Sequence, residues 1–196
     1  MFNHNRGLWG YTGTAPDGAP VTIQATGMGG PSAAIVLEEL VALGVRRAIR
    51  VGTAGSLSAE LALGELLVVE DAIVADGTSR ALGAGARATS DRGLLRALSE
   101  ADPSARVGSV VSSDLFYEVG APRFELWRSA GALAVEMEAA TLFALGALRG
   151  IHTGCVLAIS DLLGASRERI EPAALAEAGL AAGRLGLAAL MRASAP

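Results

Sequence analysis

The chain contains no lysine and only one cysteine, and aromatic residues make up just 4% of it. Its 16 basic residues are all arginines and are scattered, with Arg46 and Arg47 as the only adjacent pair. Proteins that bind nucleic acid usually cluster basic charge on one face, so we expect no nucleic-acid partner. The lone Cys155 cannot form an internal disulfide and fits a reducing compartment, which favours a cytoplasmic location.

Further absences concern membranes and metals. Residues 1–11 lack the apolar run of a secretory signal. The apolar stretch at residues 173–191 is interrupted by Glu177 and Arg184, which predicts a buried amphipathic helix and not a membrane span. The two histidines and the cysteine show no spacing typical of metal ligands. We therefore expect neither membrane association nor a bound metal.

Short runs rich in β-forming residues alternate with helical patterns, which is typical of an α/β fold. The length of 196 residues suits a single domain with one core, and no repeat or linker divides the chain. We expect strands at residues 21–26, 48–51, 66–76, 106–113 and 153–160, the third of them bent near Glu70. We expect helices at residues 32–43 (capped by Ser32), 91–101, 122–130 and 172–191, and a surface loop at 77–90.

Two glycine-containing segments follow predicted strands and could hold an anion. In GMGGPS, residues 27–32, the glycines let a ligand approach the backbone beside a helix N-terminus, although a plain tight turn is the alternative. In IRVGTAGS, residues 49–56, the side chains of Arg50 and Thr53 with the following amides suit a phosphate. An internal salt bridge from Arg50 to a core glutamate explains the same buried charge equally well.

Two glutamates stand in the otherwise apolar run AVEMEAATLF at residues 134–143. If this segment is extended, Glu136 and Glu138 face the same way, and a ligand's hydroxyl groups or a cation would help to hold both ionised. A sugar diol fits, because each hydroxyl can donate to a carboxylate. If the segment is helical, the two side chains diverge and belong to a partly solvated face.

The segment AISDLLG, residues 158–164, places Asp161 at the tip of an apolar strand. Partial desolvation there would raise the pKa of Asp161 and let it protonate a leaving group. A helix N-cap is the alternative role for this residue. Phe116 and Tyr117 follow another strand, where an aromatic ring could stack on a planar ligand, and core packing is their alternative.

Six segments occur in the order and approximate spacing seen in the nucleoside phosphorylase-I family: RGLWGYTG, TGMGGPSAAIVLEEL, IRVGTAGSL, SSDLFY, VEMEAATLF and AISD. The chain most resembles the hexameric bacterial purine nucleoside phosphorylases, with uridine phosphorylases as close relatives. The resemblance covers nearly all of the chain up to Asp161. It implies a three-layer α/β/α fold with a central mixed, partly barrel-like sheet. It also implies phosphorolysis of purine nucleosides to a free base and (deoxy)ribose 1-phosphate, with inorganic phosphate as co-substrate and no cofactor.

The same resemblance implies which residues form the site, with Asp161 and Arg50 as the catalytic pair. The implied phosphate contacts are Arg50, Thr53, Gly29 and, in the site of a neighbouring subunit, Arg6. The implied ribose contacts are Met28, Glu136, Met137 and Glu138. The implied base contacts are Gly55, Phe116, Val135, Ser160 and Asp161, which faces the purine N7. Because Arg6 serves another subunit, the resemblance implies a homo-oligomer, either a hexamer built from dimers or a dimer.

The base specificity is predicted from residues that the family uses to read the base. Uridine phosphorylases carry a glutamine and an arginine shortly after the aromatic pair, and the aligned positions here are Gly120 and Pro122. Arg123 lies one position away, so uridine stays open as an alternative substrate. Asp161 favours a purine.

Two departures from the family pattern affect the expected activity. Purine-specific members usually pair the acid with an arginine in the following helix, but the aligned residue is Ala174, with Arg167 and Arg169 nearby. The family's strand ending in a Gly-Asp-Pro-x-Arg loop, which contacts phosphate, does not occur in the sequence. A nucleosidase that uses water, or a weakly active or inactive ligand-binding relative, therefore stays open as an alternative. Arg50 and Thr53 argue against the nucleosidase, which has no anion to hold.

Overall fold

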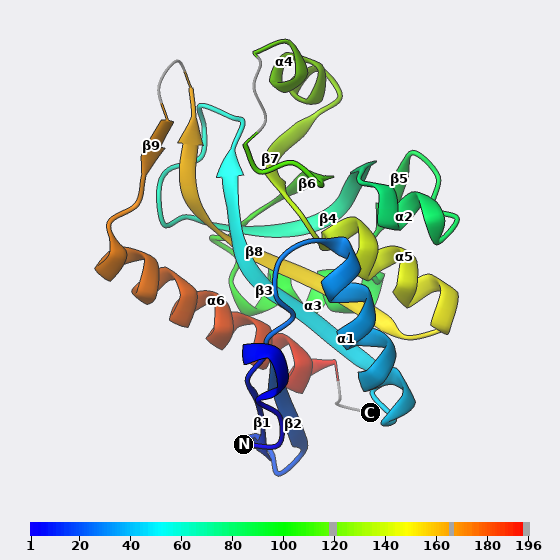
Figure 1. Cartoon of the computed structure of the whole chain (residues 1–196). Coiled ribbons are helices and arrows are strands. Elements are labelled where there is room, and N and C mark those ends of the chain that lie inside the picture. The colour runs from blue at the N-terminus through cyan, green and yellow to red at the C-terminus, as the bar shows by residue number, and fades with distance from the viewer. Residues whose placement is uncertain (118–120, 165–166, 194–196) are drawn as a thin grey trace.

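The computed structural model describes residues 1–117, 121–164 and 167–193, so that Gly120 lies outside the described residues (Figure 1). Its centre is a mixed sheet of seven strands in the order β5-β4-β6-β7-β3-β8-β9. These strands are β3 (Arg47–Ser56), β4 (Leu66–Ala75), β5 (Arg87–Thr89), β6 (Arg106–Ser113), β7 (Ala132–Glu136), β8 (His152–Leu163) and β9 (Arg167–Arg169).

The sheet closes on itself because β4 also pairs with β8. Strands β4, β6, β7, β3 and β8 therefore form a ring. The pairs β3–β8, β4–β6 and β6–β7 are parallel, whereas β3–β7 and β4–β8 are antiparallel. The predicted mixed, partly barrel-like sheet is confirmed.

Helices cover both faces of the sheet and complete three layers (Figure 1). One face carries α1 (Gly30–Ala42), α2 (Gly77–Ala81) and α5 (Ala139–Arg149), and the other carries α3 (Arg92–Ala101) and α6 (Pro172–Arg192). Strand β8 lies between the layers, and its residues 155–159 are wholly buried, as expected for an apolar strand covered on both sides. Helix α4 (Ala121–Ser129) precedes β7 in the chain and packs against it.

Helix α6 is long and apolar enough to cross a membrane by length and composition. In the structure its Ala182, Leu185 and Ala189 pack with Val68 and Val156 of the sheet. The predicted helix thus uses its apolar face to cover the sheet.

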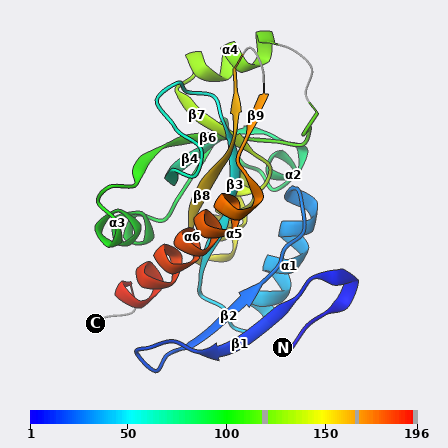
Figure 2. The same ribbon diagram turned by 90° about the vertical axis from the view of Figure 1, so that its left-hand side faces the viewer.

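The N-terminal part forms a separate antiparallel ribbon of β1 (Gly10–Thr14) and β2 (Pro20–Gln24), which extends away from the sheet (Figure 2). It follows a short 3-10 turn, η1 (Asn5–Gly7), that contains Arg6. The side chains of Trp9, Tyr11 and Ile23 are each more than half exposed on this ribbon or beside it.

Three predictions about local structure are wrong. Strand β3 does not end at Gly52, because its pairing with β8 continues to Ser56 and outweighs the weak strand preference of glycine. The predicted loop at 77–90 contains α2 and β5, since Asp76 caps α2 by accepting a hydrogen bond from the Ser79 amide at 2.7 Å.

The third wrong prediction concerns Ser32, which does not cap α1, because its hydroxyl donates to the Thr26 carbonyl at 2.5 Å. The predicted bend in β4 is confirmed by a register shift between Val69 and Ala72.

Candidate active site

A cavity of about 570 Å³ lies where the carboxyl-terminal parts of β3, β7 and β8 meet the segment that follows β6. This is where open α/β sheets usually bind ligands, and the volume is in the usual range for a small-molecule site. The structure brings most of the predicted site residues to its wall: Met28, Arg50, Thr53, Gly55, Phe116, Val135, Glu136, Met137, Glu138, Ser160 and Asp161.

Two predicted site residues do not line this cavity. Arg6 lies in η1, before the N-terminal ribbon. Gly29 is the N-cap residue of α1, and its amide donates to Glu138 Oε1 at 2.5 Å. The adjacent Gly27 and Met28 line the cavity instead.

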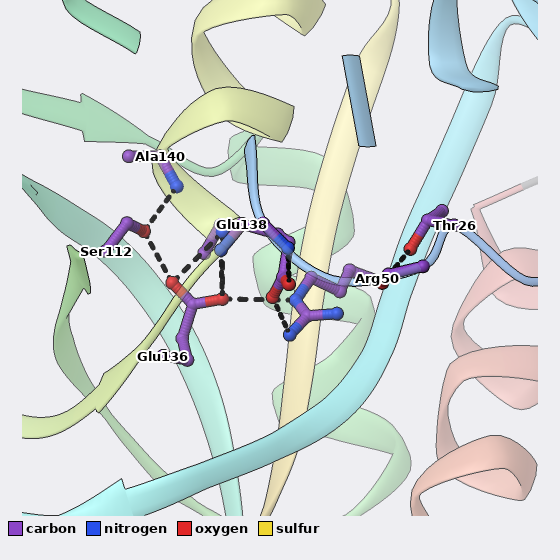
Figure 3. Close-up of polar contacts among 9 residues, drawn as sticks. Thr26, Arg50, Ser112, Glu136, Glu138 and Ala140 are labelled. Carbon is purple, nitrogen blue, oxygen red and sulfur yellow. Dashed lines mark hydrogen bonds and ion pairs between the residues drawn. The ribbon is translucent and has the colours of Figure 1, made fainter. Parts of the chain in front are cut away.

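Arg50 holds both glutamates of the apolar run (Figure 3). Its Nε donates to Glu136 Oε2 at 3.1 Å, and its Nη2 forms an ion pair with Glu138 Oε2. Strand β7 ends at Glu136 and Glu138 is the N-cap residue of α5, so neither a continuous strand nor a continuous helix carries the pair. The cation that was expected to hold both carboxylates is thus supplied by the chain itself, and the salt-bridge interpretation of Arg50 is confirmed.

Glu136 is saturated with hydrogen bonds (Figure 3). Besides Arg50, its carboxylate accepts from the Ser112 hydroxyl, from the Glu138 amide at 2.8 Å and from the Ala139 amide at 2.9 Å. Ser112 in turn accepts from the Ala140 amide at 2.8 Å. A carboxylate offers about four lone-pair positions, and these partners fill them. Glu136 therefore joins β6, β7 and the N-terminus of α5, where negative charge is favoured.

Glu138 keeps capacity to accept hydrogen bonds from a ligand. Among the described residues, its carboxylate accepts from the Gly29 amide, pairs with Arg50 and is approached by the Met137 amide, which are fewer partners than Glu136 has. Burial raises the pKa of the Glu138 carboxyl, and the charge of Glu136 adds to this while Arg50 opposes it. Of the two glutamates, Glu138 is the one able to contact a ligand.

The guanidinium of Arg50 stays charged although it is buried. Burial alone would lower its pKa, but the attraction of Glu136 and Glu138 outweighs burial and raises the pKa above its ordinary value. The backbone beside it has no room for a side chain, since a Cβ at Gly52 would lie 2.8 Å from the guanidinium carbon. Gly52 thus lets the strand run directly against Arg50.

The other end of the cavity contains Asp161, which lies within β8 and does not cap a helix. Its Oδ1 accepts from Arg167 Nε at 2.7 Å and lies 3.3 Å from Arg169 Nε, while its Oδ2 accepts from the Ser160 hydroxyl at 2.7 Å. Burial raises the pKa of Asp161, but Arg167, Ser160 and Arg169 outweigh it, so the pKa is lowered. The expected upward shift is wrong, because the hairpin of β8 and β9 brings two cations to the carboxylate.

Phe116 and Tyr117 lie beside this acid end and are not core residues. Their side chains are 52% and 81% exposed, and both line the cavity. The guanidinium carbon of Arg167 lies 4.7 Å from the centre of the Phe116 ring. The core-packing alternative is wrong, and an aromatic ring lies in the cavity wall against a charged planar group.

Some lining residues were not predicted. Phe124 and Trp127 of α4 close one side of the cavity, and Arg167 lines it from β9. Ser112, which positions Glu136, was also missed, although a polar residue ending the buried run of β6 was a visible signal. The sequence showed Arg167 only as an arginine near the acid, and its place in the cavity wall could not be predicted because β9 is short and exposed.

No group of three or more histidine, cysteine, aspartate or glutamate side chains suited to a metal ion occurs among the residues that the structure describes.

The sequence profile of the phosphorylase superfamily matches residues 1–190. The chain belongs to this superfamily. It is 37% identical to a protein of Clostridium novyi (strain NT) named purine nucleoside phosphorylase DeoD-type, over 82% of this chain and 71% of that protein. It is 37% identical to a guanosine phosphorylase of Halorubrum lacusprofundi, over 78% of this chain and 66% of that protein.

A third member of the superfamily, a uridine phosphorylase of Treponema pallidum, is 36% identical over 80% of this chain and 66% of its own length. The chain thus spans about two thirds to seven tenths of these relatives. The resemblance inferred from the six sequence segments is confirmed at the level of the family.

Proposed function

We propose that the chain is a purine nucleoside phosphorylase, which transfers a ribosyl or deoxyribosyl group from a purine nucleoside to inorganic phosphate. The observation that carries this proposal is one cavity with Arg50 and Glu138 at one end and Asp161 and Phe116 at the other. A sugar between these ends would have an anion-binding group on one side and a base-binding group on the other. The names of two relatives, a purine nucleoside phosphorylase and a guanosine phosphorylase, support the purine class.

In this reaction the C1′–N9 bond breaks and its electron pair leaves with the purine, while a phosphate oxygen forms the new bond to C1′. The sugar passes through a cation-like transition state, which a phosphate anion held beside C1′ stabilises electrostatically. We assign the phosphate to Arg50 and Thr53, and not to Gly29, whose amide already donates to Glu138. We assign the ribose to Met28, Met137 and Glu138, with Glu136 positioning Arg50. No cofactor is needed for this transfer.

We assign the base to Phe116, Val135, Gly55 and Ser160, with Asp161 at its N7 edge. Because the arginines lower the pKa of Asp161, this carboxyl is ionised in the free protein at neutral pH. Protonation of the base by Asp161 therefore requires that the bound base weakens this pairing. General acid help of this kind is worth roughly 10²–10⁴-fold in rate.

We further propose a cytoplasmic homo-oligomer, a hexamer built from dimers or a dimer, in which Arg6 reaches the phosphate of a neighbouring subunit. The exposed Trp9, Tyr11 and Ile23 beside Arg6 support this, because apolar side chains on a projecting ribbon suit an interface. Light scattering gives the subunit number. A fully active monomer would contradict the role of Arg6.

The activity is tested by incubating the purified protein with inosine, guanosine, adenosine or uridine, with and without phosphate. We expect a free purine base and ribose 1-phosphate only when phosphate is present. Equal release of base without phosphate would indicate a nucleosidase. Turnover of uridine alone would indicate the uridine phosphorylase alternative, and base binding without turnover would indicate an inactive relative.

Replacing Gly52 with alanine is expected to lower the phosphorolysis rate about 100-fold, since a misplacement near 1 Å costs roughly that much. The new methyl group would press on Arg50, which the two glutamates prevent from moving away. The control is Gly85→Ala, where the added carbon meets no atom within 4 Å. Steady-state rates of both variants check this, and equal rates would contradict the close approach of Arg50 to the strand.

A further inference from the structure

Arg167 is a planar cation held at the base end of the cavity. Its Nε donates to Asp161 Oδ1 at 2.7 Å, and its guanidinium carbon lies 4.7 Å above the Phe116 ring. The side chain is 31% exposed and lines the cavity from β9, the strand that the hairpin turns back along β8. These two contacts come from separate parts of the chain, strand β8 and the segment that follows β6.

The outer part of the guanidinium is available to a ligand. The hydrogen bond from Arg167 to Asp161 uses Nε alone. Among residues 1–117, 121–164 and 167–193, no group accepts a hydrogen bond from Nη1 or Nη2 of Arg167. A guanidinium donates and never accepts. The acceptors of Asp161 already face Arg167, Arg169 and the Ser160 hydroxyl. This end of the cavity therefore presents hydrogen-bond donors.

The N7 edge of a purine differs between the two common substrate classes. A 6-oxopurine presents two acceptors, N7 and O6, and a guanidinium binds this pair with two parallel hydrogen bonds. A 6-aminopurine presents one acceptor and one donor, so one N–H of the guanidinium would face the N–H of the amino group. Hydrogen-bond donors at this end of the cavity thus favour 6-oxopurines over 6-aminopurines.

We infer that Arg167 selects 6-oxopurine nucleosides by donating to N7 and O6 of a base stacked on Phe116, with Asp161 as the carboxylate that positions it. This inference rests on the proposed function and specifies the substrate class of the same site. The base occupies the ring face that Arg167 now covers, and the guanidinium turns about its bond to Asp161 to meet the base edge. For a 6-oxopurine the guanidinium thus takes the place at N7 that was assigned above to Asp161 as general acid. It stabilises the negative charge that develops on N7 and O6 of the departing base.

The test compares kcat/KM for inosine and adenosine in the unchanged protein, in Arg167→Gln and in the control Arg169→Gln. Arg169 also pairs with Asp161, but it does not line the cavity. We expect the unchanged protein and Arg169→Gln to prefer inosine by at least about tenfold, since a bidentate pair discriminates by about that factor or more. In Arg167→Gln the preference is expected to disappear or reverse, because a glutamine amide matches N7 and the 6-amino group of adenine.

A binding measurement separates this inference from the proposed reaction. Calorimetry with hypoxanthine and adenine, which involves no turnover, should show the same preference in the unchanged protein and its loss in Arg167→Gln. Preferential hypoxanthine binding without phosphorolysis would sustain the role of Arg167 and overturn the proposed function. Phosphorolysis of both nucleosides with equal efficiency, or an equal loss for both in Arg167→Gln, would overturn the role of Arg167. Circular dichroism of the two variants confirms that both are folded.

Discussion

Replacing Arg50 with methionine is expected to lower the free energy of unfolding by about 3–5 kcal/mol and to abolish phosphorolysis. Methionine fills similar volume, but it leaves Glu136 and Glu138 buried without their cation. Removing one partner of a buried ion pair is costly because the remaining charge has lost its water and gains nothing in return. The same change removes the group assigned to phosphate. Urea unfolding gives the stability, and the release of hypoxanthine from inosine gives the rate.

Two comparisons separate burial from charge in this prediction. Arg149→Met breaks an ion pair with Glu38 that is exposed to solvent, so its effect on the free energy of unfolding should be small. The double variant Arg50→Met/Glu138→Gln removes one of the two orphaned charges and should recover part of the stability without recovering activity. An Arg50→Met protein as stable as Arg149→Met would show that the pair is not desolvated.

Replacing each glutamate with glutamine is expected to separate a structural residue from a substrate-binding one. Glu136→Gln should lower the free energy of unfolding by about 3–5 kcal/mol, because an amide cannot accept all the hydrogen bonds that Arg50, Ser112 and two backbone amides donate. Glu138→Gln should cost less stability, since burial raises the pKa of Glu138 and so already disfavours its charged form.

The effect of Glu138→Gln should appear in kcat/KM, whereas the effect of Glu136→Gln should appear in the free energy of unfolding. Glu138→Gln is expected to remain folded and to lose about 10²-fold in kcat/KM, because the assigned ribose contact is charge-assisted. Chemical unfolding and inosine kinetics on both proteins measure the contrast. A stable Glu136→Gln protein, or a fully active Glu138→Gln protein, would reverse the roles assigned to the two residues.

The distribution of apolar residues predicted the strands and helices that have strong local patterns. Strand β6 and helix α3 lie almost where expected, and β8 is buried on both faces as its continuous apolar run indicated. The errors in strand length fall where long-range pairing overrides local preference. β3 continues through Gly52 because β8 pairs with it, and β8 continues past Ser160 because β9 folds back on it.

The sequence predicted most of the residues that line the cavity, but it did not predict which of them pair with one another. Eleven of the predicted residues line one cavity. The charged ones were predicted because polar groups at strand ends are typical of ligand sites in α/β sheets, and the apolar ones were named from the family resemblance. Which groups neutralise one another could not be predicted. Arg50 suited a phosphate or a glutamate equally well, and the raised pKa expected for Asp161 is wrong because Arg167 reaches it from another strand.

The amino-acid sequence by itself determined the family, the elements with strong local patterns and most of the side chains that line the cavity, since these follow from local patterns and from motifs in a fixed order. Only the tertiary structure decided how Glu136 and Glu138 differ. They stand two residues apart in AVEMEAATLF. The carboxylate of Glu136 is filled by hydrogen bonds from Ser112, Arg50 and the start of α5, whereas the carboxylate of Glu138 keeps acceptors that face the cavity. The reason is physical: a hydrogen bond depends on distance and direction in space, and a chain position specifies neither until the strands have paired.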